Sequence, residues 1–177
     1  MQPVESVNDV SEGPLVPLAV VLYQPEIPHN TGALMRLCAA TGVPLNLVGP
    51  LGFRLDAPAL RRAGMDYRDL AVVRRHAHWG DFCTASAGRR LVAVTTRGDE
   101  TLGRFAFAPG DQLLFGSEGA GLPPALHQSA AHRLRIPMRP GMRSLNLAMS
   151  VAVVLYEALR QLHYPGLADM NGGGCDT

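Results

Sequence analysis

Short apolar runs rich in β-branched residues recur along the chain and alternate with longer stretches of helical periodicity. Apolar runs of about four to eight residues bounded by glycine, proline and polar residues are typical of buried strands. The predicted strands cover residues 18–23, 45–48, 70–73, 91–95, 112–115 and 134–136, and the predicted helices cover 31–40, 57–63, 79–85, 123–129 and 145–162. This alternation favours an α/β fold with a mostly parallel sheet that has helices on both faces.

The last predicted helix has no consistent polar face in its first turns. Most of residues 147–155 are apolar, and the polar exceptions Ser144, Asn146 and Ser150 cluster at its start. A helix that is apolar all round is expected to be buried nearly all round. In a chain of 177 residues the sheet can cover one side, so we expect a second subunit to cover the other. The pattern therefore predicts a homodimer through this C-terminal helix.

The two ends of the chain lack the periodicity of the middle. Residues 1–17 contain Pro3, Pro14 and Pro17, and residues 167–177 are rich in glycine, so both are predicted to be mobile tails. Residues 18–166 then form a single domain. With 47% hydrophobic residues in the chain, this domain can bury a core without help from disulfides or metals.

Cysteine usage and hydropathy predict a cytoplasmic protein. Cys38, Cys83 and Cys175 are widely spaced and form no C-x-x-C pair, which argues against disulfides and a zinc knuckle. The N-terminal residues include acidic ones where a secretory signal needs basic ones, and no stretch has the ~20 apolar residues that span a bilayer. We therefore expect no membrane association.

The basic residues are unevenly spread. All 16 of them are arginine, and no acidic residue lies between Glu118 and Glu157. That segment holds Arg133, Arg135, Arg139 and Arg143, and a second basic region at residues 54–78 includes Arg61 and Arg62. Many such runs are solvated faces, but arginine also binds phosphate well, so both interpretations stay open.

Three segments that follow predicted strands are rich in glycine, proline and small polar residues: 24–32, 115–123 and 136–146. Loops at the carboxyl ends of parallel strands are where ligands bind. The glycines at 116, 119 and 121 are spaced G-x-x-G-x-G, the reverse of the dinucleotide-binding order, and no acidic residue follows at the distance that would hold a ribose. Ser117 lacks the G-x-S-x-G elbow of a hydrolase nucleophile. By themselves these glycines indicate turns.

Metal binding is not supported by the histidines or cysteines. His76 and His78 could place two imidazoles on one side of a strand, but no carboxylate or cysteine accompanies them at ligand spacing. Cys38 lies in an apolar helix and is expected to be a core thiol. We predict no metal site.

Five motifs in order resemble the SPOUT superfamily of RNA methyltransferases, and within it the small single-domain enzymes that methylate the ribose 2'-hydroxyl of tRNA position 34, on cytidine or modified uridine. They are LAVVLYQPEIPHNTGALMRLCAATG, PLGFRLDAPALRRAGMDY, VAVTTRG, LLFGSEGAGLP and RIPMRPGMRSLNLAMSVAVVLYEALRQLHYPG, and they span residues 18–166. The chain departs from the family pattern at Ala148 and Met149, where small polar and polar residues are usual.

The resemblance implies a C-terminal trefoil knot, S-adenosyl-L-methionine as cofactor, tRNA as substrate and two subunits that complete each site. Carried over by motif, the cofactor-binding residues are Val94, Thr95, Gly116, Glu118, Gly121, Ile136, Met138, Ser144 and Leu145. Gly116 suits this role because a residue without a Cβ lets the main chain approach an adenosine closely. Backbone groups of Ile136 and Leu145 would then meet the adenine edge.

The same resemblance assigns the catalytic roles to Arg36, Ser144 and Asn146. Arg36 keeps its proton at neutral pH, so it is expected to hold phosphate and stabilise a developing alkoxide rather than act as a free base. Ser144 and Asn146 would orient the hydroxyl or the cofactor. Without the resemblance, Ser144 would be interpreted as a helix N-cap.

The remaining assignments concern the RNA and the loop that follows residue 115. Asn30, Arg36, Arg139 and Arg143 are the expected RNA-binding residues, with Arg61 and Arg62 as further candidates. Glu118 is expected to brace its loop by accepting backbone N–H bonds. Without the resemblance, it would be interpreted as a surface carboxylate.

Two alternatives remain at this stage. One is a related methyltransferase for another tRNA position or for ribosomal RNA, and the other is a non-catalytic knotted RNA-binding protein. Because Asn30, Arg36, Glu118, Ser144 and Asn146 are present together, we favour the enzyme. Cofactor binding separates an enzyme from a binding protein.

Overall fold

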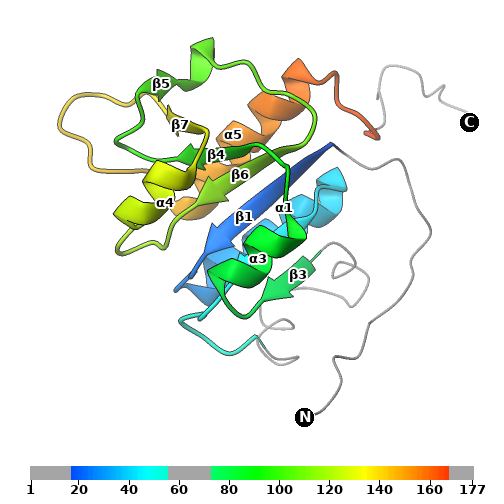
Figure 1. The fold of residues 1–177 in the computed structure, drawn as a ribbon. Helices are drawn as coiled ribbons and strands as arrows, with labels where there is room; N and C mark the ends of the chain where they lie inside the picture. The colour runs from blue at the N-terminus through cyan, green and yellow to red at the C-terminus, as the bar shows by residue number, and fades with distance from the viewer. Residues whose placement is uncertain (1–16, 56–72, 168–177) are drawn as a thin grey trace, which may run out of the picture.

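The computed structural model describes residues 17–55 and 73–167, which form a parallel sheet of seven strands with helices on both faces (Figure 1). The strand order is β3-β2-β1-β6-β4-β7-β5. The strands are β1 (Leu18–Tyr23), β2 (Leu45–Val48), β3 (Val73–His76), β4 (Leu91–Val94), β5 (Glu100–Thr101), β6 (Asp111–Phe115) and β7 (His132–Arg135). The helices are α1 (Pro28–Thr41), α3 (Trp79–Ala85), α4 (Pro124–Ser129) and α5 (Leu147–Gln161), with a 3-10 turn η2 (Leu102–Arg104).

Strand β1 shows how two cores arise from one apolar run. Its alternate residues point to opposite faces of the sheet. Val20 and Leu22 belong to a core with α1 and α5, whereas Val21 belongs to a second core with Phe82 of α3. The strand is buried on both faces, which is why it is apolar throughout rather than alternating.

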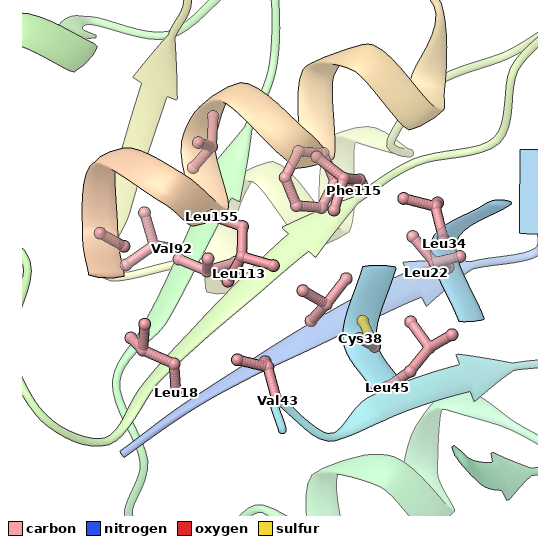
Figure 2. Packing of buried hydrophobic residues seen from close by; sticks show 14 of the residues in the cluster. Leu18, Leu22, Leu34, Cys38, Val43, Leu45, Val92, Leu113, Phe115 and Leu155 are labelled. Atoms are coloured by element: carbon pink, nitrogen blue, oxygen red, sulfur yellow. The ribbon is translucent and has the colours of Figure 1, made fainter. Parts of the chain in front are cut away.

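The larger core lies between the sheet and the pair α1 and α5, which pack against each other (Figure 2). Cys38 and Leu34 of α1 and Leu155 of α5 are almost fully buried there. Burial raises the pKa of the Cys38 thiol to about 12, so this cysteine stays protonated and inert. The expectation of a core thiol is confirmed.

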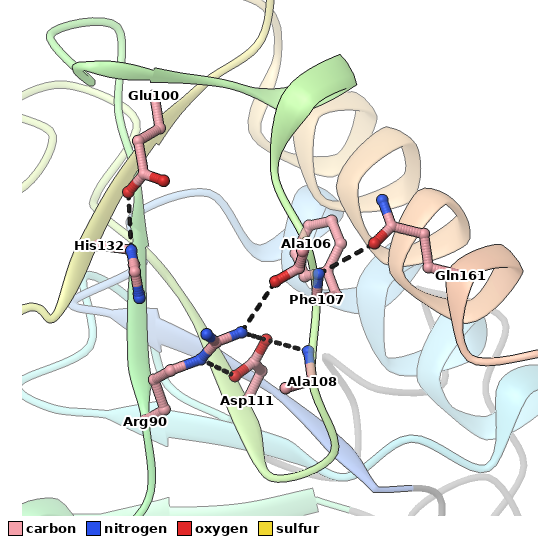
Figure 3. Close-up of polar contacts among 8 residues, drawn as sticks. All are labelled: Arg90, Glu100, Ala106, Phe107, Ala108, Asp111, His132 and Gln161. Carbon is pink, nitrogen blue, oxygen red and sulfur yellow. Dashed lines mark hydrogen bonds and ion pairs between the residues drawn. The ribbon is translucent and has the colours of Figure 1, made fainter.

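A buried carboxylate, that of Asp111, anchors the amino ends of strands β4 and β6. Asp111 at the start of β6 accepts hydrogen bonds from Arg90 Nε (2.6 Å) and Nη2 (2.8 Å), and from the Ala108 N–H (2.9 Å) (Figure 3). Nearby, Gln161 of α5 accepts a hydrogen bond from the Phe107 N–H at 2.9 Å. These contacts fix the amino ends of two central strands and the end of α5.

The predicted fold class and most predicted elements are confirmed. The predicted bounds of β1, β2 and α3 agree with the structure, and those of β4, β6, β7 and α4 differ by one or two residues. Helix α1 begins at Pro28 rather than at residue 31. Proline fits the first turn of a helix because the N–H groups there have no acceptor within the helix, so the N–H that proline lacks is not needed. The short strand β5 and the turn η2 were not predicted. The predicted helix 57–63 and residues 70–72 lie outside the described residues, as do 1–16 and 168–177.

Helix α5 is buried on one side only within a single chain. Leu147, Val151, Val154, Leu155, Ala158 and Leu159 face the core, whereas Met149, Val153 and Tyr156 are 64%, 45% and 46% exposed. The sheet and α1 thus cover one side of α5 within a single chain, as predicted, and burial of the other side by a second subunit stays a prediction. The exposed side is nonetheless apolar. The trefoil knot implied by the resemblance stays a prediction.

Candidate active site

A cavity of about 480 Å³ lies at the carboxyl edge of the sheet. Strands β1, β6, β4 and β7 are neighbours in this order, so the segments that leave their carboxyl ends meet at one place. We call them loop 1 (residues 24–27, after β1), loop 2 (116–123, after β6) and loop 3 (136–146, after β7). These loops and the first turns of α1 and α5 supply most of the lining, together with Val94 and Phe115 at the ends of β4 and β6 and with Thr95 and Thr96 after β4.

The residues predicted to hold the cofactor all line this cavity: Val94, Thr95, Gly116, Glu118, Gly121, Ile136, Met138, Ser144 and Leu145. Asn30, Arg143 and Asn146 line it as well. Arg36 and Arg139 are exposed and are not part of the lining. The structure therefore brings together all of the predicted pocket residues but leaves two predicted arginines outside it.

Glu118 connects loop 2 to loop 1. Its Oε2 accepts a hydrogen bond from the Glu26 N–H (2.8 Å), and its Oε1 accepts from the Ile27 N–H (3.3 Å) and from Asn30 Nδ2 (3.0 Å). A carboxylate is well suited to this because it only accepts, and the N–H groups of Glu26 and Ile27 lie just before α1, outside its own hydrogen bonds. Glu118 thus braces the neighbouring loop, and the interpretation as a plain surface carboxylate is wrong.

Asn146 connects loop 3 to the same cluster. Its Oδ1 accepts hydrogen bonds from the Ala148 N–H (2.9 Å) and the Met149 N–H (3.4 Å), which makes Asn146 the N-cap of α5. Its Nδ2 donates to Asn30 Oδ1 at 3.1 Å. Asn30 is 6% exposed and therefore joins Asn146 to Glu118 through one buried amide. The interpretation of Ser144 as the N-cap is wrong, because Asn146 takes that position two residues later.

Loop 2 folds back on itself at Gly116. A Cβ at this position would overlap the carbonyl group of Gly121 and the nitrogen of Leu122. The loop is closed by a bridge in which the Gly121 N–H donates to the Ser117 carbonyl oxygen at 2.9 Å, with Gly121 at a φ of 70°. Glycine is thus required at 116 for loop closure. The prediction gave only the approach of a ligand as the reason, and the structure adds a contact inside the protein.

The two histidines considered as metal ligands have other contacts. His76 Nε2 lies 2.9 Å from Asn46 Oδ1, and its ring packs edge-on against Phe82. Burial lowers the pKa of His76, with the charge of Arg74 acting in the same direction and that of Asp81 opposing it. His78 is the N-cap residue of α3. Among residues 17–55 and 73–167, no group of three His, Cys, Asp or Glu residues is placed to hold a metal ion.

Sequence reasoning missed several residues of this site. Ile27, Ser117 and Ser150 line the cavity, and Glu26 contacts loop 2 although it is far from it in sequence. Only the position of Ile27 and Glu26, directly before a helix that starts with proline, could have indicated a role at the start of the helix.

No helix in the described part of the chain is long and apolar enough to cross a bilayer.

Comparison with known proteins gives concordant matches. The profile of the SpoU rRNA Methylase family matches residues 17–156. The tRNA (cytidine(34)-2'-O)-methyltransferase of Methylovorus glucosotrophus (strain SIP3-4) is 50% identical over 149 residues, which make up 83% of this chain and 97% of the relative.

Solved structures are similar in the same region. One, described as structural insights into the 2-OH methylation of C/U34 on tRNA, has a TM-score of 0.78 and 47% identity and covers 82% of this chain and 96% of its own. The SpoU methyltransferase AviRb of Streptomyces viridochromogenes, solved in complex with the cofactor AdoMet, has a TM-score of 0.74 and 27% identity. That match covers 91% of this chain and 63% of AviRb.

Proposed function

Because the chain belongs to the SpoU rRNA Methylase family, we propose that it transfers a methyl group from S-adenosylmethionine to the ribose 2'-hydroxyl of nucleotide 34 of tRNA. The observation that carries this proposal is the likeness to a tRNA (cytidine(34)-2'-O)-methyltransferase over nearly the whole of that relative. The family match includes all three loops that line the cavity. The nucleotide would be a cytidine or a modified uridine, and a tRNA-modifying enzyme would work in the cytoplasm.

The cavity suits S-adenosylmethionine in size and chemistry. Its volume of about 480 Å³ falls within the range of about 300–1,000 Å³ that is usual for pockets of small ligands. Val94, Ile136 and Leu145 offer apolar surface for an adenine ring, and the main chain of loops 2 and 3 offers donors and acceptors for its edge. Glu118 adds a carboxylate to the lining, which suits a cationic ligand.

When bound, the cofactor supplies a methyl group already activated on a sulfonium centre. The chain then has to hold a ribose hydroxyl in line with that methyl group and assist the loss of its proton. Ser144 is exposed at the cavity wall, and we assign to it the orientation of the hydroxyl. The amide of Asn146 is engaged by α5 and by Asn30, so Asn146 acts by positioning loop 3 against the first turn of α1.

Arginines around the cavity would bind the RNA. Arg143 lines the cavity, and Arg139 is exposed on the same loop, so both can meet phosphates beside the target ribose. Arg36 lies outside the cavity of its own chain, and we propose that it acts in a site completed by a second subunit. There its permanently charged guanidinium would hold phosphate and stabilise the developing alkoxide. The candidates Arg61 and Arg62 lie outside the described residues.

We also propose that the protein is a homodimer through α5. The exposed apolar residues Met149 and Val153 are four positions apart, and Tyr156 follows three positions later, so they form one stripe on the helix. Met142 and Leu145, at the end of loop 3, are 62% and 41% exposed. Loop 3 and the stripe are contiguous in sequence, so a subunit docked here would lie beside the cavity.

The direct test of the reaction is to map ribose methylation in total tRNA from cells with and without the protein. We expect one ribose methylation, at nucleotide 34, to disappear in its absence and to be restored by the purified protein with S-adenosylmethionine. Restoration at another tRNA or ribosomal position would contradict the assignment of position 34. Purified protein should also melt at least about 5 °C higher with saturating cofactor.

Replacement of Arg36 tests the catalytic assignment. We expect Arg36→Ala to lower the rate of methyl transfer by about 10²-fold or more, because a guanidinium that stabilises developing charge acts only in the transition state. Dimerisation and the cofactor-induced rise in melting temperature should be unchanged. A suitable control is Arg89→Ala, since Arg89 is exposed before β4 at the opposite edge of the sheet. Unchanged turnover in Arg36→Ala would remove Arg36 from the mechanism.

A further inference from the structure

Loops 1 and 2 are joined by hydrogen bonds that run in both directions. The Glu26 N–H donates to the carboxylate of Glu118 at 2.8 Å, and the Gly119 N–H donates to the carboxylate of Glu26 at 3.2 Å. Each loop therefore contributes one carboxylate to the contact, and each carboxylate accepts from backbone N–H groups of the other loop. Glu118 lines the cavity, whereas Glu26 does not, so Glu26 would act on the cavity only through loop 2.

The space around Glu26 is shaped by glycines on both sides. A Cβ on Gly119 would lie 2.9 Å from Glu26 Oε2, and a Cβ on Gly52 would lie 2.9 Å from Glu26 Cα. Gly52 also donates its N–H to the Pro25 carbonyl oxygen at 3.0 Å, which holds loop 1 from the other side. The backbone of Glu26 is thus held against Gly52 while its carboxylate reaches the backbone of Gly119.

The position of Gly119 matters because it lies in the wall of the cavity. Gly119 and its neighbours Glu118 and Ala120 all line the cavity, and Gly119 and Ala120 are exposed. An exposed glycine has wide backbone freedom, so without a partner its N–H would sample many positions. The hydrogen bond that the Gly119 N–H donates to the Glu26 carboxylate restricts that motion before any ligand binds.

We propose that Glu26 is a positioning residue that presets the cofactor-binding wall of loop 2 through its hydrogen bond to the Gly119 N–H. This inference rests on the proposed function, since it concerns affinity for S-adenosylmethionine. Glu26 touches neither the cofactor nor the ribose. Its loss weakens cofactor binding because the bound loop conformation must then be ordered during binding.

Two substitutions at Glu26 separate the hydrogen bond from the charge. Glu26→Ala removes both, whereas Glu26→Gln removes the charge but keeps a carbonyl oxygen that can accept from the Gly119 N–H. We expect Glu26→Ala to raise the Kd and the KM for S-adenosylmethionine about three- to tenfold, with kcat and the KM for tRNA changed by less than about twofold. Glu26→Gln should restore most of the lost affinity.

A measurement on the protein without cofactor gives a readout independent of activity. We expect the backbone amide of Gly119 to exchange with solvent faster in Glu26→Ala than in the unchanged chain and in Glu26→Gln. Glu100→Ala is the matched control. This substitution also removes a hydrogen-bonded carboxylate, whose partner is His132, but Glu100 lies on β5 outside the cavity lining. This control should leave Gly119 exchange and cofactor affinity unchanged.

The outcomes separate this inference from the proposed function. If the unchanged chain binds S-adenosylmethionine and Glu26→Ala binds it equally well, the positioning role of Glu26 is refuted and the proposed function stands. If Glu26→Gln loses as much affinity as Glu26→Ala, the hydrogen bond is not the cause and the inference is again refuted. If the unchanged chain binds no S-adenosylmethionine, both the proposed function and the inference fail.

Discussion

Gly116 and Gly119 lie three positions apart in loop 2, and at each the absence of a Cβ leaves room for a different contact. At Gly116 a Cβ would meet backbone atoms of Gly121 and Leu122, which cannot move without opening the loop. At Gly119 it would meet the end of the Glu26 side chain, which can turn away. A substitution is therefore expected to be much more damaging at Gly116 than at Gly119.

Gly116→Ala is expected to weaken cofactor binding by loop 2. The added methyl group would displace the segment at Gly121, which itself lines the cavity, so we expect the Kd for S-adenosylmethionine to rise by more than about tenfold. Isothermal titration calorimetry measures this directly. The control is Gly103→Ala in η2, where a Cβ would meet nothing within 4 Å. Wild-type affinity in Gly116→Ala would contradict the closed form of loop 2.

For single residues, the sequence predicts membership of the cavity lining better than it predicts the hydrogen-bond partners of each side chain. The resemblance placed Glu118 and Gly116 at the cofactor site, and the structure lines the cavity with both. It did not indicate that Glu118 contacts residues about 90 positions earlier, since such pairs depend on the strand order. Glu26 was missed for the same reason. The side chain of Glu26 accepts a hydrogen bond from a backbone N–H. Every residue except proline has such a group, so the residue types at positions 118–120 do not reveal this contact.

Among the secondary-structure elements, short buried strands were easier to predict than helix starts. Strand β2 is wholly buried and β1 is buried except at Tyr23, so their apolar runs coincide with their bounds. Strand β5 has two residues, too few for any pattern. The start of α5 was placed two residues early because Leu145 continues the apolar run, whereas the hydrogen bonds of Asn146 set the true boundary.

The double use of Asn146 allows its two roles to be separated. Asn146→Asp keeps an oxygen that caps α5 but cannot donate to Asn30, whereas Asn146→Ala loses both contacts. We expect Asn146→Ala to lower the free energy of unfolding by about 1 kcal/mol, and Asn146→Asp to lower it less, because the cap remains. Both variants should lose methyl transfer, since both release loop 3 from the first turn of α1.

Chemical denaturation and single-turnover assays of the two variants measure these effects. Asn46→Asp provides a comparison: Asn46 also contacts another side chain, His76, but lies in β2 away from the cavity lining. It should retain methyl transfer. Full activity in Asn146→Asp would show that the contact between Asn146 and Asn30 has no part in the reaction.

For the whole molecule, α5 is the element that links the core, the cavity and the outer surface. Val151, Val154 and Leu155 are fully buried against the sheet and α1. The N-cap of the helix lines the cavity, and Met149 and Val153 lie exposed on the other side. Large apolar side chains in one stripe are costly to leave in water, and a stable dimer buries about 800 Å² of each partner. The fold therefore places a surface suited to a second copy beside the cavity.

Val153→Glu tests whether this surface forms the dimer. We expect the unchanged protein to be a dimer by light scattering and Val153→Glu to be a monomer, because a carboxylate buried without a partner in an apolar interface costs several kcal/mol. The monomer should stay folded, since Val153 is 45% exposed in the single chain. Methyl transfer should be lost along with dimerisation, because we place Arg36 in a site that two subunits complete.

The control for Val153→Glu introduces the same charge elsewhere on the surface. Ala85 is an exposed apolar residue at the end of α3, on the opposite face of the sheet, so Ala85→Glu should remain an active dimer. Activity in monomeric Val153→Glu would show that one chain suffices for transfer, and Arg36 would then have to act at its own subunit's cavity.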